Sequence, residues 1–278
     1  MKIALMPNLE KPEARACAGN VQEILATHGC TFVQKQELPI YAGKYTEEAL
    51  SELKSCDLFI VIGGDGTIIH TAKLAASVDC PLLGINAGTL GFTAGLEPEE
   101  LNLLPRLLSG EYLEESRLML SVQVISGKKK STFTALNDAV VSGELARLAD
   151  YEMALGNDRA FHCRADGFLV ATPTGSTAYS LSAGGPVIQP DMQCLVYTPI
   201  CPHAFFNRSL VFGGETQLTV DIPSNTARLF LTVDGEAPIA LNVGDRLIFR
   251  RAERSVNFIR IKNRSFFNVL DQKLINAR

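Results

Sequence analysis

The sequence predicts two domains, a Rossmann-like α/β domain followed by a β-sandwich-like, all-β domain. Up to about Gly110, short apolar runs alternate with longer segments of helical periodicity, which is the βαβ pattern of a parallel sheet. After Glu115 the pattern changes to short runs in which apolar and polar residues alternate, as in antiparallel strands. We therefore expect the α/β domain over residues 1–115, the β-rich domain over 116–264, and a terminal segment, 265–278, that returns to the first domain.

The first domain is expected to alternate strands with helices through right-handed crossovers. Glycine and proline mark the helix ends, since Gly29 closes the first helix while Pro98 and Gly110 bracket the last. The expected strands are Lys2–Met6, Thr31–Gln34, Leu58–Ile62 and Pro81–Ile85, and the expected helices are Pro12–His28, Glu47–Lys54, Thr67–Ala76 and the segment between Pro98 and Gly110.

The second domain is expected to contain short, mostly antiparallel strands separated by turns. Gly156-Asn157-Asp158 is one turn signal, and Asp234-Gly235 predicts a hairpin. Lys128-Lys129-Lys130 follows Ser126-Gly127 and is expected to be a solvated hairpin tip. The expected strands are Met119–Ile125, Thr132–Val141, Tyr151–Leu155, Ala160–Arg164, Phe168–Ala171, Arg228–Val233 and Ala237–Leu241.

The bulk composition argues against several classes of protein. The net charge of −4 and the pI near 5.7 give no field that would attract nucleic acid or an anionic membrane. The apolar stretch Ile3–Met6 is too short for the core of a signal peptide, and no segment approaches the ~20 apolar residues of a membrane span. The seven cysteines form no C-x-x-C pair, so we expect them to be reduced and mostly buried. The composition therefore predicts a cytoplasmic protein whose affinity for phosphates comes from local groups.

The run Gly63-Gly64-Asp65-Gly66-Thr67 places a carboxylate inside a glycine turn at the end of a strand, where α/β sheets bind ligands. Glycines let backbone N–H groups approach an anion, and the following helix N-terminus favours phosphate. Gly66 is expected to let the loop pass close to a phosphate, with a positive φ as one way to do so. Asp65 would repel that phosphate unless it held Mg²⁺ or accepted a proton from an attacking hydroxyl, which are both tasks of phosphoryl transfer. The plain alternative is a tight turn with an Asx hydrogen bond.

A second glycine loop, Asn86-Ala87-Gly88-Thr89-Leu90-Gly91-Phe92, follows the next strand and should lie on the same edge of the sheet. Taken alone, Gly88 and Gly91 would equally well shape a turn, and Phe92 would equally well belong to the core. The presence of two such loops favours one phosphate cleft.

The pair Asn137-Asp138 interrupts an otherwise apolar strand and must find hydrogen-bond partners if it is buried. A ribose is a fitting partner, because an amide donates and accepts while a carboxylate accepts from hydroxyls. A polar pair that caps a β-bulge is the structural alternative.

Arg164 and Asp166 straddle Ala165 and would face the same side of a strand, either as an exposed salt bridge of little energetic value or as ligand contacts. The string from Asp166 to Pro186 that begins here is dense in glycines and small hydroxyl residues. Within it, Thr172–Tyr179 turns from a strand into a helix whose free N–H groups can bind a phosphate or an amide. N-capping by Thr174 or Ser176 explains this turn equally well.

With these motifs the chain resembles the NAD kinases over nearly its whole length, most specifically at residues 63–67, 86–92, 137–138 and 164–186. The resemblance implies transfer of the γ-phosphoryl group of ATP, or of polyphosphate, to the 2′-hydroxyl of the adenosine ribose of NAD, with a divalent metal ion such as Mg²⁺. It also implies a homodimer or homotetramer, and Asp65 as the catalytic acid/base residue. The residues implied for NAD are Asp65, Gly66, Phe92, Asn137, Asp138, Arg164, Asp166, Thr174, Thr177, Ala178, Tyr179, Ser180, Leu181, Ser182 and Glu236, and those for ATP are Gly63, Gly64, Gly66, Thr67, Asn86 and Gly88.

Some positions depart from the usual pattern of this family. Asp138 stands where Glu is common, Ala165 where Gly is frequent, and Glu236 where Gln is frequent. The turn Asp234-Gly235 is expected to serve mainly the hairpin. We expect a structural role for His203 and Arg208, which belong to a weaker family segment. The same is expected of His28, His70 and His162, because none of them shows the spacing of a catalytic triad or of metal ligands.

Two other functions stay open. Another kinase with a GGDGT loop, such as a diacylglycerol-type lipid kinase or a phosphofructokinase relative, would share residues 63–67 but not the string from Asp166 to Pro186. A nonenzymatic dinucleotide sensor would retain the pocket without turnover, and the presence of Asp65 argues against it. A turnover assay with NAD, ATP and Mg²⁺ separates these functions.

Overall fold

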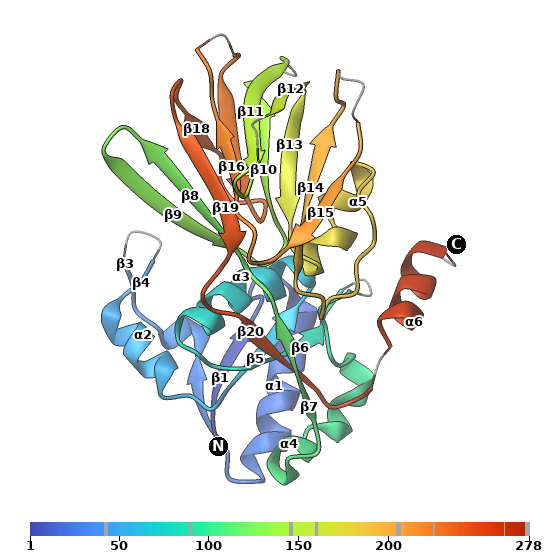
Figure 1. Cartoon of the computed structure of the whole chain (residues 1–278). Helices are drawn as coiled ribbons and strands as arrows, with labels where there is room; N and C mark the ends of the chain where they lie inside the picture. Colours follow the sequence, from blue (N-terminus) through green and yellow to red (C-terminus); the bar gives the residue numbers. More distant parts are fainter. Residues whose placement is uncertain are drawn as a thin grey trace. The chain divides into compact units, whose positions relative to one another are not determined.

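The computed structural model describes residues 1–41, 44–88, 91–144, 147–158, 161–203, 207–224, 226–263 and 265–275. The chain divides into two compact units: Met1–Ser116 together with Val256–Arg278 form unit 1, and Arg117–Ser255 form unit 2. Unit 1 combines helices with a largely parallel sheet, and unit 2 consists mainly of antiparallel sheets, as the sequence predicts (Figure 1). In the part of the chain that the structure describes, no helix is long and apolar enough to cross a membrane.

Unit 1 is built on a six-stranded sheet in the order β2-β1-β5-β6-β20-β7. Strands β2, β1, β5, β6 and β20 pair in parallel. The strands are β1 (Lys2–Pro7), β2 (Thr31–Gln34), β5 (Leu58–Gly63), β6 (Leu82–Asn86), β7 (Leu113–Arg117) and β20 (Val256–Arg260), and the α-helices are α1 (Pro12–Ala26), α2 (Glu47–Lys54), α3 (Asp65–Ser77), α4 (Arg106–Ser109) and α6 (Phe266–Leu270).

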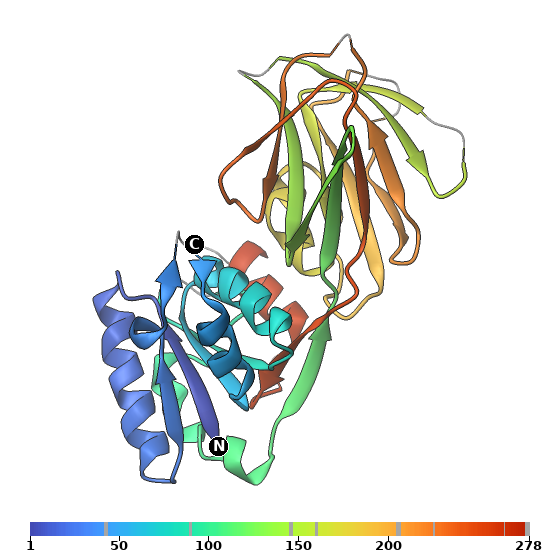
Figure 2. The ribbon, with the colours of Figure 1, turned by 90° about the vertical axis from the view of Figure 1, so that its left-hand side faces the viewer.

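Helices cover both faces of this sheet, with α1 on one face and α3 on the other (Figure 2). Every residue of β5 is buried, as expected for a parallel strand enclosed between helices. Its residues alternate between the two faces, so Ile60 and Ile62 pack in one cluster with Val21 and Leu25 of α1. The period of the apolar residues in the sequence therefore determines which helix each side chain meets.

Unit 1 departs from the expected elements at several points. Helix α3 begins at Asp65 rather than at Thr67. The helix expected between Pro98 and Gly110 is divided into a 3-10 helix, Pro98–Leu103, and α4, because Pro105 between them has no N–H to continue a helix. The short antiparallel pair β3 (Ile40–Tyr41) and β4 (Lys44–Tyr45) and a short 3-10 helix, Lys35–Glu37, have no counterpart in the expected elements.

The chain returns to unit 1 earlier than the sequence indicates. The return begins at Val256 with β20, not at residue 265, because β20 extends the parallel sheet beside β6. Helix α6 and a single π-helical turn, Asp271–Ile275 (η5), follow β20. The boundary expected at residues 264–265 thus lies within the terminal part of unit 1.

Unit 2 contains two six-stranded sheets, in the orders β15-β14-β13-β10-β17-β18 and β12-β11-β16-β19-β8-β9. The strands are β8 (Leu120–Ser126), β9 (Lys129–Ala135), β10 (Asp138–Gly143), β11 (Ala149–Leu155), β12 (Phe161–Ala165), β13 (Gly167–Ala171), β14 (Cys194–Ile200), β15 (Leu210–Gly213), β16 (Leu218–Asp221), β17 (Leu229–Val233), β18 (Ile239–Leu241) and β19 (Arg246–Arg251). A 3-10 helix, Thr174–Thr177 (η4), and the one-turn helix α5 (Tyr179–Ser182) follow β13.

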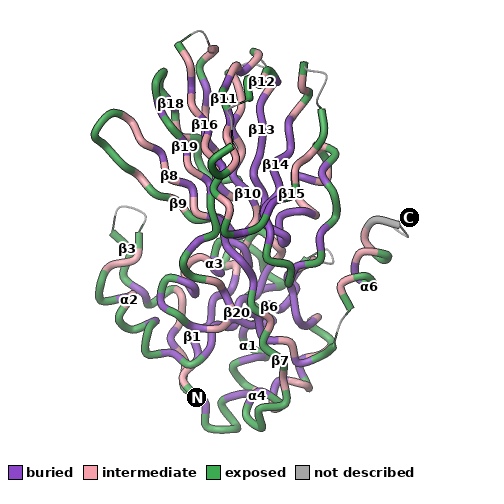
Figure 3. Tube along the Cα trace, viewed as in Figure 1, coloured by how far each residue is buried: buried purple, intermediate pink, exposed green. Residues whose placement is uncertain are grey.

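Side chains from both sheets of unit 2 form one core. Buried residues lie on strands of both sheets (Figure 3). Phe168 of β13 lies 4.6 Å from the ring of Tyr151 on β11, 5.8 Å from Tyr197 on β14 and 5.9 Å from Phe249 on β19. Because Tyr151 and Phe249 belong to one sheet and Phe168 and Tyr197 to the other, these rings interlock the two layers. The β-sandwich-like arrangement is therefore confirmed.

The strand expected over Thr132–Val141 is divided between the two sheets. Its first part belongs to β9 and its second to β10, and Leu136-Asn137 joins them. The expectation of one continuous strand is wrong. The chain passes from one sheet to the other at Leu136-Asn137, where the hydrogen-bond ladder of β9 ends and that of β10 begins. The hairpin of β8 and β9 turns at Gly127, with a φ of 58°, which confirms the lysine-bearing hairpin tip.

Candidate active site

The carboxyl ends of β1, β5 and β6 carry the loops that the sequence predicts to bind phosphate. Gly63 at the end of β5 pairs in register with Asn86 at the end of β6. Asn8, directly after β1, donates a side-chain hydrogen bond of 3.2 Å to the Thr67 hydroxyl. The two glycine loops therefore lie on one edge of the sheet, the usual ligand-binding edge of α/β folds.

Gly63 and Gly64 turn the chain from β5 into α3. A Cβ at Gly63 would lie 2.7 Å from the Thr67 side chain, so a larger residue does not fit there without a shift. Gly64 is the extended N-cap of α3, and Asp65 begins the first turn. The N–H groups of this turn have no intrahelical acceptor and carry the positive end of the helix dipole, which suits phosphate.

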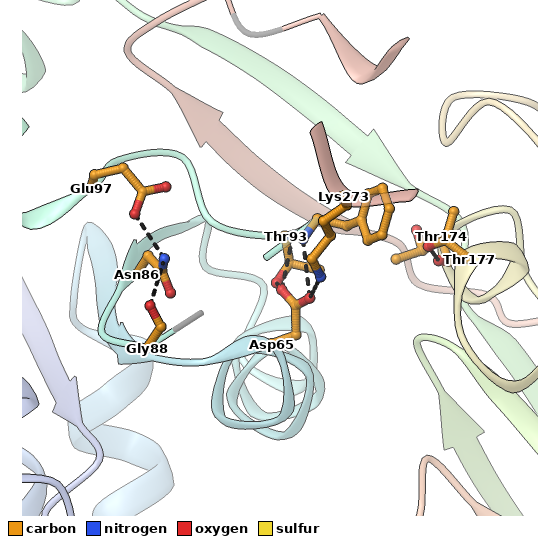
Figure 4. A network of polar contacts seen from close by, with 9 residues as sticks. Asp65, Asn86, Gly88, Thr93, Glu97, Thr174, Thr177 and Lys273 are labelled. Carbon is orange, nitrogen blue, oxygen red and sulfur yellow. Dashed lines mark hydrogen bonds and ion pairs between the residues drawn. The ribbon is translucent and has the colours of Figure 1, made fainter. Parts of the chain in front are cut away.

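The second glycine loop holds the Asp65 carboxylate (Figure 4). Asp65 Oδ2 accepts the Phe92 N–H at 3.0 Å, and Oδ1 accepts the Thr93 N–H at 3.1 Å and the Thr93 hydroxyl at 2.6 Å. Lys273 Nζ lies 3.3 Å from Oδ2. Burial alone would raise the pKa of Asp65, but the hydrogen bonds from Thr93 and Phe92 and the charge of Lys273 outweigh burial and hold this pKa below its ordinary value. Asp65 is therefore ionised at neutral pH.

Three residues around Asp65 are absent from the set implied by the sequence. A Cβ at Gly91 would lie 2.3 Å from Asp65 Oδ1, so this glycine lets the loop approach the carboxylate. Thr93 directly follows the predicted loop, and extending the motif by one residue would have found it. Lys273 is 208 residues from Asp65 along the chain, and no local pattern points to it.

Gly66 does not need the backbone freedom that a glycine allows. It lies in the first turn of α3, its φ is not positive, and a Cβ there would meet nothing within 4 Å. The expectation of a positive φ is wrong because the helix already begins at Asp65.

We expect Gly66→Ala to keep or raise the melting temperature, because Ala is favoured over Gly in a helix by about 0.5–1 kcal/mol. Gly66→Val should also fold, and its side chain on the phosphate-facing turn should lower turnover. Melting temperature and turnover, measured together on both variants, check this prediction. Full turnover of the Val variant would show that no phosphate passes close to Gly66.

Asn86 organises the second loop from within. Its amide donates to the Glu97 carboxylate at 2.7 Å and to the Gly88 carbonyl at 3.4 Å (Figure 4). Both amide protons of Asn86 thus have acceptors within the protein. Thr89 and Leu90 of this loop lie outside the described residues.

A cavity of about 730 Å³ lies beside the second loop and contains a lysine on its wall. Lys11, the N-cap residue of α1, and the Ala87-Gly88 segment are among its lining residues. Lys11 Nζ would be 3.3 Å from a Cβ placed on Gly88. Sequence reasoning missed Lys11, although its place between the first strand and the first helix puts it at the same edge as the glycine loops.

Unit 2 contains a cavity of about 410 Å³ that gathers several of the residues implied for NAD. Asn137 and Asp138 line it from the start of β10, and Ala178 and Tyr179 line it from the junction of η4 and α5. Tyr179 is 45% exposed, whereas Asp138 is buried. The structure thus brings together two motifs that are about forty residues apart in the sequence. They meet because β10 pairs with β13, the strand that leads into η4 and α5.

Asp234, which also lines this cavity, fixes the Asn137-Asp138 segment. Its carboxylate accepts the N–H groups of Leu136 and Asn137 at 2.8 Å and of Asp138 at 3.1 Å. The hairpin predicted at Asp234-Gly235 is confirmed, with positive φ at both residues. Sequence reasoning identified the turn but not the role of the carboxylate.

Asp138 has an unusual protonation behaviour for a carboxyl group. Burial, and then the negative charge of Asp234, raises the pKa of Asp138 to about 7. Near neutral pH, both protonation states are populated, and the protonated form can donate as well as accept a hydrogen bond.

We predict that Asp138 makes the free energy of unfolding fall as pH rises. Between about pH 4 and about pH 7, this carboxyl keeps its proton in the folded protein but has lost it in the unfolded chain. Its favourable contribution to the free energy of unfolding is therefore complete below this window and absent above it. Melting temperatures of wild type and Asp138→Asn across this window measure the difference, and the wild type should lose stability relative to the variant. Asp79→Asn, at an exposed position where a φ of 58° suits Asn, is the matched control. Parallel curves for wild type and Asp138→Asn would contradict the prediction.

The hydroxyl-rich segment after β13 forms two short turns instead of one helix. Ala178 separates η4 from α5, because its φ of −96° and ψ of −131° are not helical. Thr172, rather than Thr174 or Ser176, accepts the N–H of Gly175 at 3.1 Å. The expectation of a helix capped by Thr174 or Ser176 is therefore corrected.

Most hydroxyls of this segment bind other parts of unit 2. Ser176 Oγ accepts the Ile188 N–H at 3.0 Å, and fully buried Ser180 shares a hydrogen bond of 3.3 Å with Thr198. Thr174 accepts a hydrogen bond of 3.2 Å from Arg117, which sequence reasoning did not identify. The hydroxyls of Ser176 and Ser180 therefore have hydrogen-bond partners within unit 2.

The other members of this segment remain accessible. The Thr177 hydroxyl lies 3.4 Å from the Thr174 carbonyl (Figure 4), Leu181 is half-buried, and Ser182 is exposed.

Arg164, Asp166 and Glu236 are not among the residues that line the cavity of about 410 Å³, although Gly235, next to Glu236, lines it. Arg164 Nε on β12 is 3.8 Å from Asp150, and Arg164 lines a separate, apolar cavity. Asp166 lies at the bend between β12 and β13, so the expectation that Arg164 and Asp166 share a strand face is wrong. Glu236 is exposed directly after the Gly235 turn.

The described residues offer few ligands to a metal ion. Within the described ranges, no group of three or more His, Cys, Asp or Glu side chains could hold one. Mg²⁺ commonly binds through one or two carboxylates together with substrate phosphates. Asp65 fits that limited role, since it is an ionised carboxylate beside the glycine loops.

Comparisons with known proteins match both units. The ATP-NAD kinase N-terminal domain matches residues 3–112, and the ATP-NAD kinase C-terminal domain matches residues 136–261. The NAD kinase of Symbiobacterium thermophilum is 40% identical over 281 aligned residues, which cover 98% of each chain. The NAD kinase of Natranaerobius thermophilus is 34% identical, with 99% of this chain and 98% of the relative covered.

Two solved structures share the fold. Yeast NADH kinase complexed with NADH superposes with a TM-score of 0.84 at 22% identity, covering 100% of this chain and 88% of the other. An NAD kinase from Archaeoglobus fulgidus in complex with ATP gives a TM-score of 0.75 at 24% identity, covering 100% of both chains. Because both family domains match and relatives of up to 40% identity align along nearly the whole length, this chain belongs to the NAD kinase family.

Proposed function

We propose that this NAD kinase uses Asp65 to orient the acceptor hydroxyl while the glycine loops bind the phosphates of the donor. The observation that carries this proposal is the ionised Asp65 carboxylate, fixed by Phe92 and Thr93 at the first turn of α3. Phosphoryl transfer depends chiefly on positioning and charge neutralisation. A carboxylate with a lowered pKa is a weak base, so it suits orientation of the hydroxyl, and it accepts the proton late, once the new bond to phosphorus has made the hydroxyl acidic.

The acceptor is assigned to the cavity of unit 2. The Asn137 amide and the Asp138 carboxyl line it, and both groups can donate and accept hydrogen bonds, as a ribose edge requires. We propose the 2′-hydroxyl of the adenosine ribose of NAD as the reacting group. Tyr179 offers a ring face, partly exposed, on which a base can stack.

The donor is assigned to the glycine loops and to the cavity beside Gly88. The free N–H groups of the first turn of α3 attract phosphate oxygens, and Lys11 adds a positive charge beside Gly88. We propose ATP as the donor, with polyphosphate as an alternative that the same groups would bind. A divalent metal ion, Mg²⁺ by expectation, would neutralise donor charge when bound, with Asp65 as its candidate protein ligand.

A turnover assay with each donor and each acceptor tests the function. Formation of NADP from NAD and ATP with Mg²⁺ is the expected result, and parallel reactions with NADH or polyphosphate define the specificity. Binding of NAD without product from any donor would identify a nonenzymatic sensor.

Asn137→Ala is expected to raise the KM for NAD more than the KM for ATP. The amide lines the unit 2 cavity, and a lost hydrogen bond to ribose should weaken binding by about 1–3 kcal/mol. Steady-state kinetics with each substrate varied in turn measure the two effects, and a melting curve checks the fold. Equal increases in both KM values, or simple unfolding, would return the segment to a structural role.

We also propose a cytoplasmic homodimer or homotetramer, as the resemblance implies. All seven cysteines are free thiols, which suits a reducing compartment. Light scattering on the purified protein measures the oligomeric state.

A further inference from the structure

The end of the chain reaches the carboxylate that we place at the acceptor hydroxyl. Lys273 on η5 directs its ammonium group at Asp65, with Nζ 3.3 Å from Oδ2 and 4.5 Å from the centre of the Phe92 ring (Figure 4). The two charged side chains are only 27% and 29% exposed. A residue outside both glycine loops thus contacts the centre of the proposed reaction.

Apolar contacts dock this terminal segment. The Phe266 ring of α6 lies 6.3 Å from the Phe92 ring, and Val269 of α6 is buried. Phe92 therefore packs against α6, lies under the Lys273 ammonium, and donates its own N–H to Asp65. The position of Lys273 does not depend on the ion pair alone.

The contact between Lys273 and Asp65 bears on the orientation of the carboxylate. A partly exposed ion pair contributes little to the free energy of folding. A docked ammonium group 3.3 Å from Oδ2 restricts rotation of the carboxylate. Among the described residues, the groups that face Asp65 are Phe92, Thr93 and Lys273, of which only Lys273 is charged.

We propose that Lys273 is a positioning residue of the kinase reaction, which holds the Asp65 carboxylate in one orientation for the acceptor hydroxyl. The inference rests on the proposed role of Asp65 and assigns Lys273 no contact with NAD or ATP. A terminal cap that competes with the acceptor would have the opposite sign, because removing Lys273 would then increase turnover.

Lys273→Met tests the inference, because Met keeps an unbranched chain against Phe92 and removes the charge. We expect kcat to fall by about 10-fold and the KM values to stay unchanged, because the carboxylate loses its fixed orientation. Lys273→Arg should restore most of kcat. Lys262→Met is the matched control, since Lys262 pairs with Glu100, a different carboxylate of unit 1.

The double variant Asp65→Asn/Lys273→Met separates this inference from the proposed function. If Lys273 acts through Asp65, Lys273→Met has no further effect once Asp65 is replaced. Unchanged turnover in Asp65→Asn alone would overturn the proposed role of Asp65 together with the inference. If Asp65→Asn is inactive, the inference alone is overturned by a Lys273→Met variant that behaves like Lys262→Met, that turns over faster than wild type, or that raises a KM by as much as it lowers kcat.

Discussion

Asp65→Asn should lower kcat by about 10²–10⁴-fold, the range of effects of losing a positioned acid/base group. The amide keeps the shape of the side chain, but its neutral oxygen is a weak proton acceptor. The NH₂ group of the new amide also takes the place of an oxygen that accepts a hydrogen bond in the wild type. If it replaces Oδ2, it faces two other donors, the Phe92 N–H and the Lys273 ammonium. Turnover with NAD and ATP and the affinity for NAD by calorimetry are the measurements.

The fold should survive this substitution. The remaining amide oxygen can still accept from Thr93, so we expect a stability loss of about 1–3 kcal/mol for the unsatisfied donors. Asp79→Asn is the matched control, because it makes the same chemical change at an exposed position of unit 1. Turnover of Asp65→Asn close to that of this control would remove Asp65 from the mechanism.

Gly91→Ala should cause the second large loss of turnover. The Cβ of the new alanine would be 2.3 Å from Asp65 Oδ1. Because that oxygen is the end of a flexible side chain, we expect the Asp65 side chain to rotate and the backbone to stay in place. Rotation breaks the hydrogen bonds from Phe92 and Thr93, and a displacement of about 1 Å at a reacting group can cost about 10²-fold in rate.

The control for this prediction is Gly19→Ala in α1. Gly19 is an exposed helical glycine at which a Cβ meets nothing within 4 Å, so the same substitution should stabilise slightly and leave turnover unchanged. Turnover and melting temperature are compared across the two variants. If Gly91→Ala loses activity only in proportion to the fraction unfolded, the close approach of this loop to Asp65 has no catalytic meaning.

The sequence by itself determined the elements whose causes are local. Apolar periodicity located β5 and α2, turn chemistry located the Asp234-Gly235 hairpin, and two glycine loops after successive strands predicted a shared edge. The family was also legible, because its motifs are contiguous strings of residues. These features depend on neighbours within a few positions, which a single sequence displays directly.

Only the tertiary structure decided which partner each polar side chain meets. Burial decides whether a hydroxyl in a glycine-rich string can reach a ligand or bonds to another part of the protein. Ser180, for example, is fully buried and shares a hydrogen bond with Thr198. Asp234 reads as a turn residue until β10 lies beside β17, which brings the N–H groups of residues 136–138 to its carboxylate. Lys273 meets Asp65 only because β20 carries the chain back to the first sheet. Hydrogen bonds and ion pairs act over a few ångströms in space, so a contact 208 residues away in sequence exists only once the sheets have assembled.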